Sequence, residues 1–407
     1  MRKRADQIGD VSDSAPDGWI EPLRMGDSHA LLILASDAAD DLAHEVVYHV
    51  RRLAEAGIAL VYAQEGRVRS DDPGHEHFGF KDGISQPGIR GVTTPNNPAD
   101  PNQGAPGQDL LQPGEFVLGY PTQPGPPPPT PVPSPAPYPV PANTPATPTP
   151  VPDAVAGPPS QSGPAWTVDG SYLVFRRLRQ DVKGFRDFLT EQGAALGLDP
   201  GVFGAKLVGR YASGAPLERT KDQPATLDPS QGDPSIADPA LLDDTRINNF
   251  EYGQDVGGQL VPRAAHIRKA YPRDQTPPGE ATTQTHRLLR RGIPFGAPFA
   301  LGASSTSVHG ADVTFPDDRG LLFLCYQRSI ADQFEFVQNA WVNNKDFPQA
   351  GDGHDPIIAQ RDNPRDFALL DAQNRHVQLM RHWVTTTGGD YFFQPSIAAL
   401  QRLSGMG

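Results

Sequence analysis

A proline-rich tract at residues 121–164 sets the tightest limit on the fold. It holds nineteen of the 45 prolines of the chain, mixed with Thr, Ala, Val and Ser. Proline fixes φ and lacks a backbone donor, so we expect the tract to be extended or disordered rather than helix or central strand. The pattern favours a solvated loop insertion, with a ligand for SH3-like or WW-like domains and an O-glycosylated stalk as open alternatives. The tract divides the foldable chain into residues 1–120 and 165–407.

Composition excludes several classes of protein. The formal net charge of −13 and the lack of a long Lys/Arg run argue against nucleic acid or an anionic membrane as the main partner. The single cysteine, Cys325, excludes an intrachain disulfide and a thiolate metal site, and it is expected in the core. No stretch of about 18 apolar residues is present, so neither a membrane span nor a signal peptide is expected. We predict a cytoplasmic location, although the loop-like opening of the chain suggests an incomplete N-terminal side and leaves export open.

Hydrophobic periodicity predicts two passes of an α+β unit. In the first pass, an amphipathic helix over 40–56 lies between apolar runs at 30–35 and 59–63 that are typical of strands. The second pass comprises a strand over 170–178, a helix over 181–197, a buried strand over 319–327, a helix over 331–341, and a strand and turn pair over 376–389 and 390–395. The order of elements therefore indicates a duplicated α+β fold.

His266 stands in the basic segment VPRAAHIRKAYPRD, with Arg268, Lys269 and Arg273 after it. These cations are expected to lower the pKa of the imidazole and keep it neutral, which is the form that binds a metal. Such a segment could supply a haem with one nitrogen for iron and cations for the propionates. On this segment alone, an exposed basic loop that contains a histidine is the favoured interpretation.

Two other stretches are ambiguous when each is read alone. Asp82 lies in FGFKDGISQP, where Asp-Gly is also the composition of an ordinary turn. The segment HRLLRRGIPFG at 286–296 suits a solvated turn, or a buried arginine beside a carboxylate in a site that moves protons. His75 and His77 in GHEHF could coordinate a metal ion, but no third ligand lies nearby in the sequence. A polar loop is therefore the favoured interpretation.

Taken together and in order, FGFKDGISQPGIRG, AAHIRKAYPRD and RLLRRGIPFG resemble the dye-decolorizing peroxidases, a haem peroxidase family with a G-x-x-D-G motif, here residues 79–83. The resemblance covers about residues 27–120 and 165–402 and extends to GSYLVFRRLRQDV, LLFLCYQRSIADQFEFVQNAW, GHDPIIAQ and WVTTTGGDYFFQPS. One departure is Thr387, where an arginine is expected.

The resemblance implies an α+β fold of two ferredoxin-like halves, at 1–120 and 165–407, with the first half incomplete and the second holding haem b (iron protoporphyrin IX). It implies that His266 is the proximal iron ligand, Asp82 the distal acid and Arg290 the distal arginine, with Arg291 as the alternative. The further haem-binding residues that we expect are Arg268, Arg273, Gly83 and Ile84.

The implied activity is that of a peroxidase that uses hydrogen peroxide to oxidise bulky aromatic dyes or phenols. The alternative is a haem- or iron-handling binding protein with little turnover, and a third interpretation makes the proline-rich tract an interaction module. His266 needs a hydrogen-bond acceptor for its other nitrogen, and Asp332 or Glu335 is expected to supply it. Surface tryptophans or tyrosines are expected to relay electrons, and homo-oligomerisation is left open.

Overall fold

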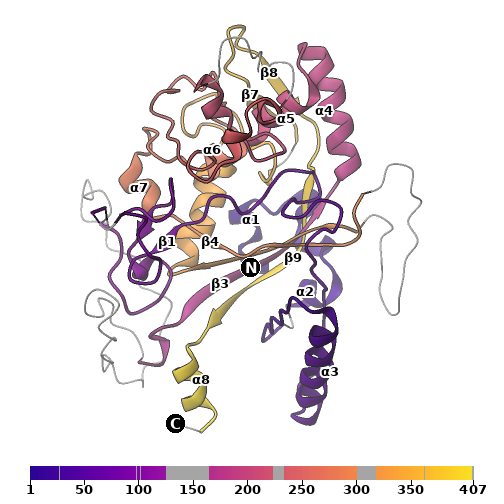
Figure 1. Cartoon of the computed structure of the whole chain (residues 1–407). Helices are drawn as coiled ribbons and strands as arrows, with labels where there is room; N and C mark the ends of the chain where they lie inside the picture. Colours follow the sequence, from indigo (N-terminus) through magenta and orange to yellow (C-terminus); the bar gives the residue numbers. More distant parts are fainter. Residues whose placement is uncertain are drawn as a thin grey trace.

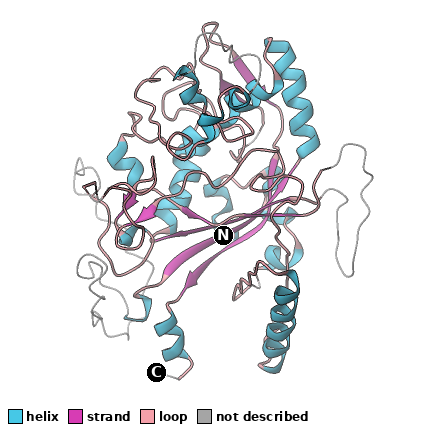
Figure 2. Ribbon diagram, in the orientation of Figure 1, coloured by secondary structure: helices cyan, strands magenta, loops and turns pink. Residues whose placement is uncertain are grey.

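An antiparallel five-stranded sheet runs through the middle of the structure (Figures 1 and 2). This computed structural model describes residues 1–26, 28–97, 99–100, 102–124, 165–222, 233–299, 318–361 and 363–405. The strand order is β4-β6-β3-β9, and β5 also pairs with β6. The strands are β3 (Ser171–Gln180), β4 (Leu289–Arg290), β5 (Ile293–Phe295), β6 (Gly320–Gln327) and β9 (Val384–Gln394).

The register of the sheet explains which of its residues are buried. Val174 of β3 lies opposite Cys325 of β6, and both side chains are fully buried. The prediction of a core role for Cys325 is therefore confirmed. Two smaller sheets pair β1 (Gly88–Ile89) with β2 (Leu110–Leu111), and β7 (Arg365–Ala368) with β8 (His376–Leu379).

Helices flank the sheet, and in Figure 1 α4 to α7 lie above it while α3 and α8 lie below. Asp181 and Asp199 cap the first turns of α4 and α5 by accepting hydrogen bonds from backbone N–H groups, and left-handed glycines end both helices. The helices are α1 (Ala5–Ile8), α2 (Glu21–Met25), α3 (Ala39–Glu55), α4 (Val182–Leu196), α5 (Pro200–Val208), α6 (His266–Ala270), α7 (Glu280–Gln284) and α8 (Ile397–Leu403), with two π-helical segments, η10 (Ile330–Glu335) and η11 (Val337–Val342).

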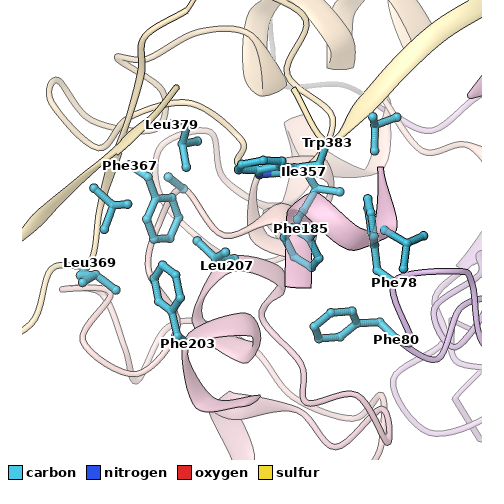
Figure 3. Close-up of a cluster of buried hydrophobic side chains, with 14 residues drawn as sticks. Phe78, Phe80, Phe185, Phe203, Leu207, Ile357, Phe367, Leu369, Leu379 and Trp383 are labelled. Atoms are coloured by element: carbon cyan, nitrogen blue, oxygen red, sulfur yellow. The ribbon is translucent and has the colours of Figure 1, made fainter. Parts of the chain in front are cut away.

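The largest apolar core lies between α4, α5 and the strands β7 to β9 (Figure 3). Phe185 of α4 is fully buried in it, next to Trp383. Phe78 and Phe80, from the loop that carries Asp82, pack against Phe185 with ring centroids 4.4 and 6.5 Å away. Burial of each large side chain is worth about 1.5–3 kcal/mol. This core therefore anchors a loop of the first part of the chain onto the second.

The predicted strands at 30–35 and 59–63 are wrong. Both segments lack strand pairing, and Leu32, Ile33 and Leu60 are each about half exposed. A buried strand needs a neighbouring strand, and no described segment provides one here. The helix between them forms as α3, one residue from its predicted bounds, but none of its residues is buried.

Most of the second pass of elements follows the prediction, but residues 376–395 form β8 and β9, and β9 continues through residues 389 and 390, where the strand was expected to end. The predicted strands at 170–178 and 319–327 and the helix at 181–197 match β3, β6 and α4. The helix expected at 331–341 is confirmed, although its turns are π-helical. The α+β class is therefore confirmed. The proline-rich tract lies outside the described residues except for 121–124, and the division into units at 1–120, 121–164 and 165–407 stays a prediction.

Candidate active site

One pocket brings together the three motifs that the sequence singled out. His266 begins α6, Asp82 lies in the 79–83 loop and Arg290 ends β4, and all three side chains line this pocket. Its walls are otherwise mainly apolar and include Phe323, Val342, Ile357 and Ile358. The fold thus joins motifs that are up to 208 residues apart in the sequence.

The imidazole of His266 is oriented by a buried carboxylate. Its Nδ1 lies 2.9 Å from Oδ2 of Asp355, whose other oxygen accepts hydrogen bonds from the backbone N–H groups of Ile357 and Ile358 at 2.8 and 2.9 Å. Asp355 is fully buried. With Nδ1 engaged, Nε2 is the nitrogen left for a ligand in the pocket.

The electrostatics of this pair differ from the sequence-based expectation. Burial disfavours the charged imidazole, but the charge and hydrogen bond of Asp355 outweigh it and raise the pKa of His266. Burial opposes ionisation of Asp355 too, yet His266 and the two backbone donors lower the pKa of this carboxyl. The expected lowering of the imidazole pKa by neighbouring cations is therefore wrong.

The acceptor expected for His266 was also misidentified. Asp332 reaches Arg328, with 3.7 Å between their side-chain atoms, and Glu335 binds Arg4 and the hydroxyl of Tyr391. Both acids therefore have other partners. Asp355 was missed because, although GHDPIIAQ was noted, nothing in its local spacing connects it with His266.

Asp82 and Arg290 form a polar part of the same pocket. Nη1 of Arg290 lies 3.3 Å from Oδ1 of Asp82, and its Nη2 donates to the backbone carbonyl of Ser85 at 3.0 Å. Both side chains of the pair are about one-third exposed. The side-chain amide of Gln86 accepts from the backbone N–H of Arg290 and donates to the backbone carbonyl of Arg290, each at 3.1 Å. These two bonds hold the segment that follows Asp82 against β4.

The glycines of the motif permit the turn of the loop. Gly79 and Gly83 have φ of +102° and +78°, a region that side-chain-bearing residues rarely adopt. A Cβ at either position would have no described heavy atom within 4 Å. The need for glycine here is therefore conformational and is not a matter of crowding within the chain.

The remaining predicted site residues divide into two groups. Gly83, Ile84 and Arg273 line the pocket. Arg268 does not: it is fully buried elsewhere, where it binds Asp255 and the carbonyl of Val261. The assignment of Arg268 to haem binding is therefore wrong.

Arg291, the alternative to Arg290, lies outside the lining of the main pocket. It lines an adjoining hollow with Asp82 and Arg290, and it donates to the carbonyl of Arg290 at 2.8 Å rather than to Asp82. The geometry therefore favours Arg290 as the arginine that acts with Asp82.

The pocket fits a flat apolar group that carries anionic substituents, as haem does. Arg210 and Arg273 line it, and their guanidinium groups donate to backbone carbonyls and to the side chain of Asn248. Within the described residues Arg210 has no ion pair, and burial, followed by the nearby Arg273, lowers its pKa to about 9. The hydroxyl of Tyr252, also at this wall, is buried without a partner among the described residues. Haem propionates would satisfy both groups, and neither was singled out from the sequence.

Neither the His75 and His77 pair nor any other described group of side chains forms a metal site, and no described helix could span a membrane. His77 is buried with Nε2 on the carbonyl of Phe295, and His75 contacts Asp72. No cluster of three potential metal ligands is found among the described side chains. None of the described helices combines the length and apolar character needed to cross a bilayer. The cytoplasmic location, the homo-oligomer and docking to SH3-like or WW-like domains stay predictions.

Comparison with known proteins places this geometry in one family. A family model described as "Dyp-type peroxidase, C-terminal" matches residues 147–350. Dye-decolorizing peroxidase msp1 of Mycetinis scorodonius is 30% identical over 97% of this chain and 69% of its own length. Dye-decolorizing peroxidase AauDyP1 of Auricularia auricula-judae is 32% identical over 94% of this chain and 66% of its own.

A solved structure of a dye-decolorizing peroxidase in complex with 2,6-dimethoxyphenol superposes with a TM-score of 0.71 at 28% identity, over 98% of this chain and 78% of that one. Sequence and fold therefore agree over almost the whole chain. The chain belongs to the dye-decolorizing peroxidase family, and it is a haem-dependent peroxidase.

Proposed function

We propose that the chain binds haem b through His266 and uses Asp82 and Arg290 to cleave hydrogen peroxide, with bulky aromatic dyes or phenols as electron donors. The observation that carries the proposal is the arrangement of one pocket, with an Asp355-bound imidazole at one wall and an Asp82–Arg290 pair at another. When bound, haem would supply the iron that receives peroxide and takes up the oxidising equivalents.

His266 would bind the iron through the lone pair of Nε2, because Asp355 keeps the proton of the imidazole on Nδ1. Arg210, Arg273 and the hydroxyl of Tyr252 would hold the propionates, since they supply cations and a donor at one wall. The apolar side chains would cover the macrocycle and exclude water.

Asp82 would move a proton within the peroxide. Its carboxylate can accept a proton from one peroxide oxygen and return it to the other, which leaves as water. Arg290, 3.3 Å away, would keep Asp82 ionised and stabilise negative charge on the departing oxygen. Cleavage of one peroxide consumes two electrons, so two molecules of a one-electron aromatic donor are oxidised in each cycle.

The relative solved with 2,6-dimethoxyphenol supports a phenolic donor for this chain. A large dye needs an electron path to the buried pocket. Trp19, Trp341 and Trp383 are each 3% exposed, and Trp166 is half-buried, so Trp166 is the tryptophan best placed to accept electrons at the surface.

The test is to reconstitute the protein with hemin and to measure peroxide consumption and dye oxidation. Asp82→Asn and Arg290→Leu are expected to retain the Soret band and to lose most of the rate with peroxide. Arg52→Leu is the matched control, since it removes an exposed guanidinium on α3 that lines neither this pocket nor the hollow beside it. A haem carrier would instead release hemin to an acceptor protein and react equally slowly with peroxide in all forms, which would contradict the proposal.

A further inference from the structure

Glu76 occupies the centre of the loop that presents Asp82, and no step of the proposed mechanism uses it. Its carboxylate accepts hydrogen bonds from the backbone N–H groups of Phe78 and Phe80, each at 2.9 Å. The side-chain amide of Gln180, at the end of β3, donates to the same carboxylate. Three donors from two distant parts of the chain therefore converge on one side chain.

The backbone of Glu76 closes the same loop. Its N–H donates to the carbonyl of Phe80 at 3.1 Å, and its carbonyl accepts from the N–H of Gly79 at 2.9 Å. Beyond Phe80, the N–H of Lys81 donates to the carbonyl of Ala212 at 3.0 Å. The segment before Asp82 is thus folded around the Glu76 carboxylate.

The chemical character of Glu76 is unusual for a purely structural residue. It lines the same pocket as Asp82. Among the described residues, Arg69 donates to the backbone carbonyl of Glu76, but no cation forms an ion pair with its carboxylate. Burial, opposed by its hydrogen bonds, raises the pKa of this carboxyl, and the charge of Asp82 raises it further. A buried carboxylate without a cation is costly, so its retention requires the hydrogen bonds that it accepts.

From these contacts we infer that Glu76 is a positioning residue for Asp82. The loop donors need acceptors at two oxygens at once, which a carboxylate provides. A glutamine offers a single acceptor oxygen, and its NH₂ group would face a backbone N–H or the Gln180 amide. The loop would then rearrange, and Asp82 would move relative to Arg290, from which it is now 3.3 Å away. A misplacement of about 1 Å can cost roughly 100-fold in rate.

The inference rests on the proposed role of Asp82, and a double-mutant cycle in the haem-loaded enzyme tests the two separately. Glu76→Gln is expected to lower the second-order rate constant for peroxide by about 10- to 100-fold, with an unchanged Soret band and an unchanged KM for the phenolic donor. In the Asp82→Asn background the same change is expected to cost less than about threefold, because residues that act through one another are not additive. Glu191→Gln, the same substitution on the exposed surface of α4, is the matched control and is expected to be silent.

Each outcome separates the two claims. If Asp82→Asn alone leaves the peroxide rate intact, the proposed function fails. If Asp82→Asn is impaired but Glu76→Gln reacts like the wild type, or if the two losses multiply, the positioning role is overturned. Should Glu76→Gln fail to fold, Gln180→Leu removes one donor to the same carboxylate; a smaller loss that disappears in the Asp82→Asn background supports the inference, and no loss refutes it.

Discussion

Replacing Asp355 with asparagine should weaken haem binding by changing which nitrogen of His266 carries the proton. The two backbone N–H groups that bind Oδ1 of Asp355 can keep an oxygen acceptor in the variant. The NH₂ group of asparagine then takes the place of Oδ2, 2.9 Å from Nδ1 of His266. An amide N–H there donates to Nδ1 and favours the tautomer with its proton on Nε2, which cannot bind iron.

The size of the effect follows from the bond that is lost. A hydrogen bond to a charged group contributes about 1.5–3 kcal/mol, and about 1.4 kcal/mol corresponds to a factor of ten in affinity. Loss of such a partner of a metal-binding histidine typically costs about 10- to 100-fold in affinity, which agrees with this range. We therefore expect Asp355→Asn to bind hemin about 10- to 100-fold more weakly than the wild type.

Hemin titration of the apoprotein, followed at the Soret band, measures this affinity, and circular dichroism checks the fold. Asp352→Asn is the control because Asp352 is equally buried but pairs with Arg263, at 2.7 Å, and does not contact the imidazole. It should lose stability and keep its hemin affinity. Equal hemin affinities for Asp355→Asn and the wild type, with both proteins folded, would refute the reasoning.

Three further results are expected. Asp82→Asn and Arg290→Leu should each lower kcat/KM for peroxide by about 10²- to 10⁴-fold at unchanged hemin affinity, measured by stopped-flow mixing; a loss below tenfold would contradict their role. Burial and nearby cations lower the pKa of His354 from 6.5 to about 4, so its neutral ring stabilises the fold fully above pH 6.5 and this contribution is lost as the pH falls toward 4. Between pH 7 and pH 4, the free energy of unfolding measured with urea should fall by about 1–2 kcal/mol less in His354→Asn than in the wild type, after allowance for the partial exposure of the ring. Equal decreases in the two proteins would contradict this. A Cβ on Gly320 would lie 1.8 Å from the carbonyl oxygen of Leu178, so Gly320→Ala should destabilise the β3–β6 pairing by about 1–3 kcal/mol or more, and an unchanged Tm would be inconsistent with that contact.

Local patterns in the sequence identified the residue types of the site but not their partners. Asp82, His266 and Arg290 lie in short motifs whose order along the chain is visible in the sequence. The acceptor for His266 lies 89 residues away, and only the folded chain brings it within 2.9 Å. The same limit applied to the strands expected at 30–35 and 59–63, because an apolar run does not reveal whether a neighbouring strand exists.

One wrong assignment follows from a helix at 266–270 that was not predicted from the sequence. Arg268 follows His266 by two residues at the start of α6, and residues i and i+2 of a helix project in nearly opposite directions. If His266 faces the pocket, Arg268 must face away, as the structure has it. Arg273 lies beyond the end of the helix, so its direction does not follow from helical spacing.

The Asp355–His266 pair and the Asp82–Arg290 pair differ in burial, and this difference matches their different proposed roles. Asp355 is fully buried, and the low dielectric around it strengthens its bond to His266, which suits its proposed role of orienting a haem ligand. Asp82 and Arg290 are about one-third exposed, so water screens their attraction, and the pair adds little to the free energy of unfolding. In the proposed mechanism, that same exposure would let peroxide enter and water leave beside Asp82. Substitutions at the exposed pair should therefore reduce turnover without destabilising the protein, whereas substitutions at Asp355 should reduce both stability and haem affinity.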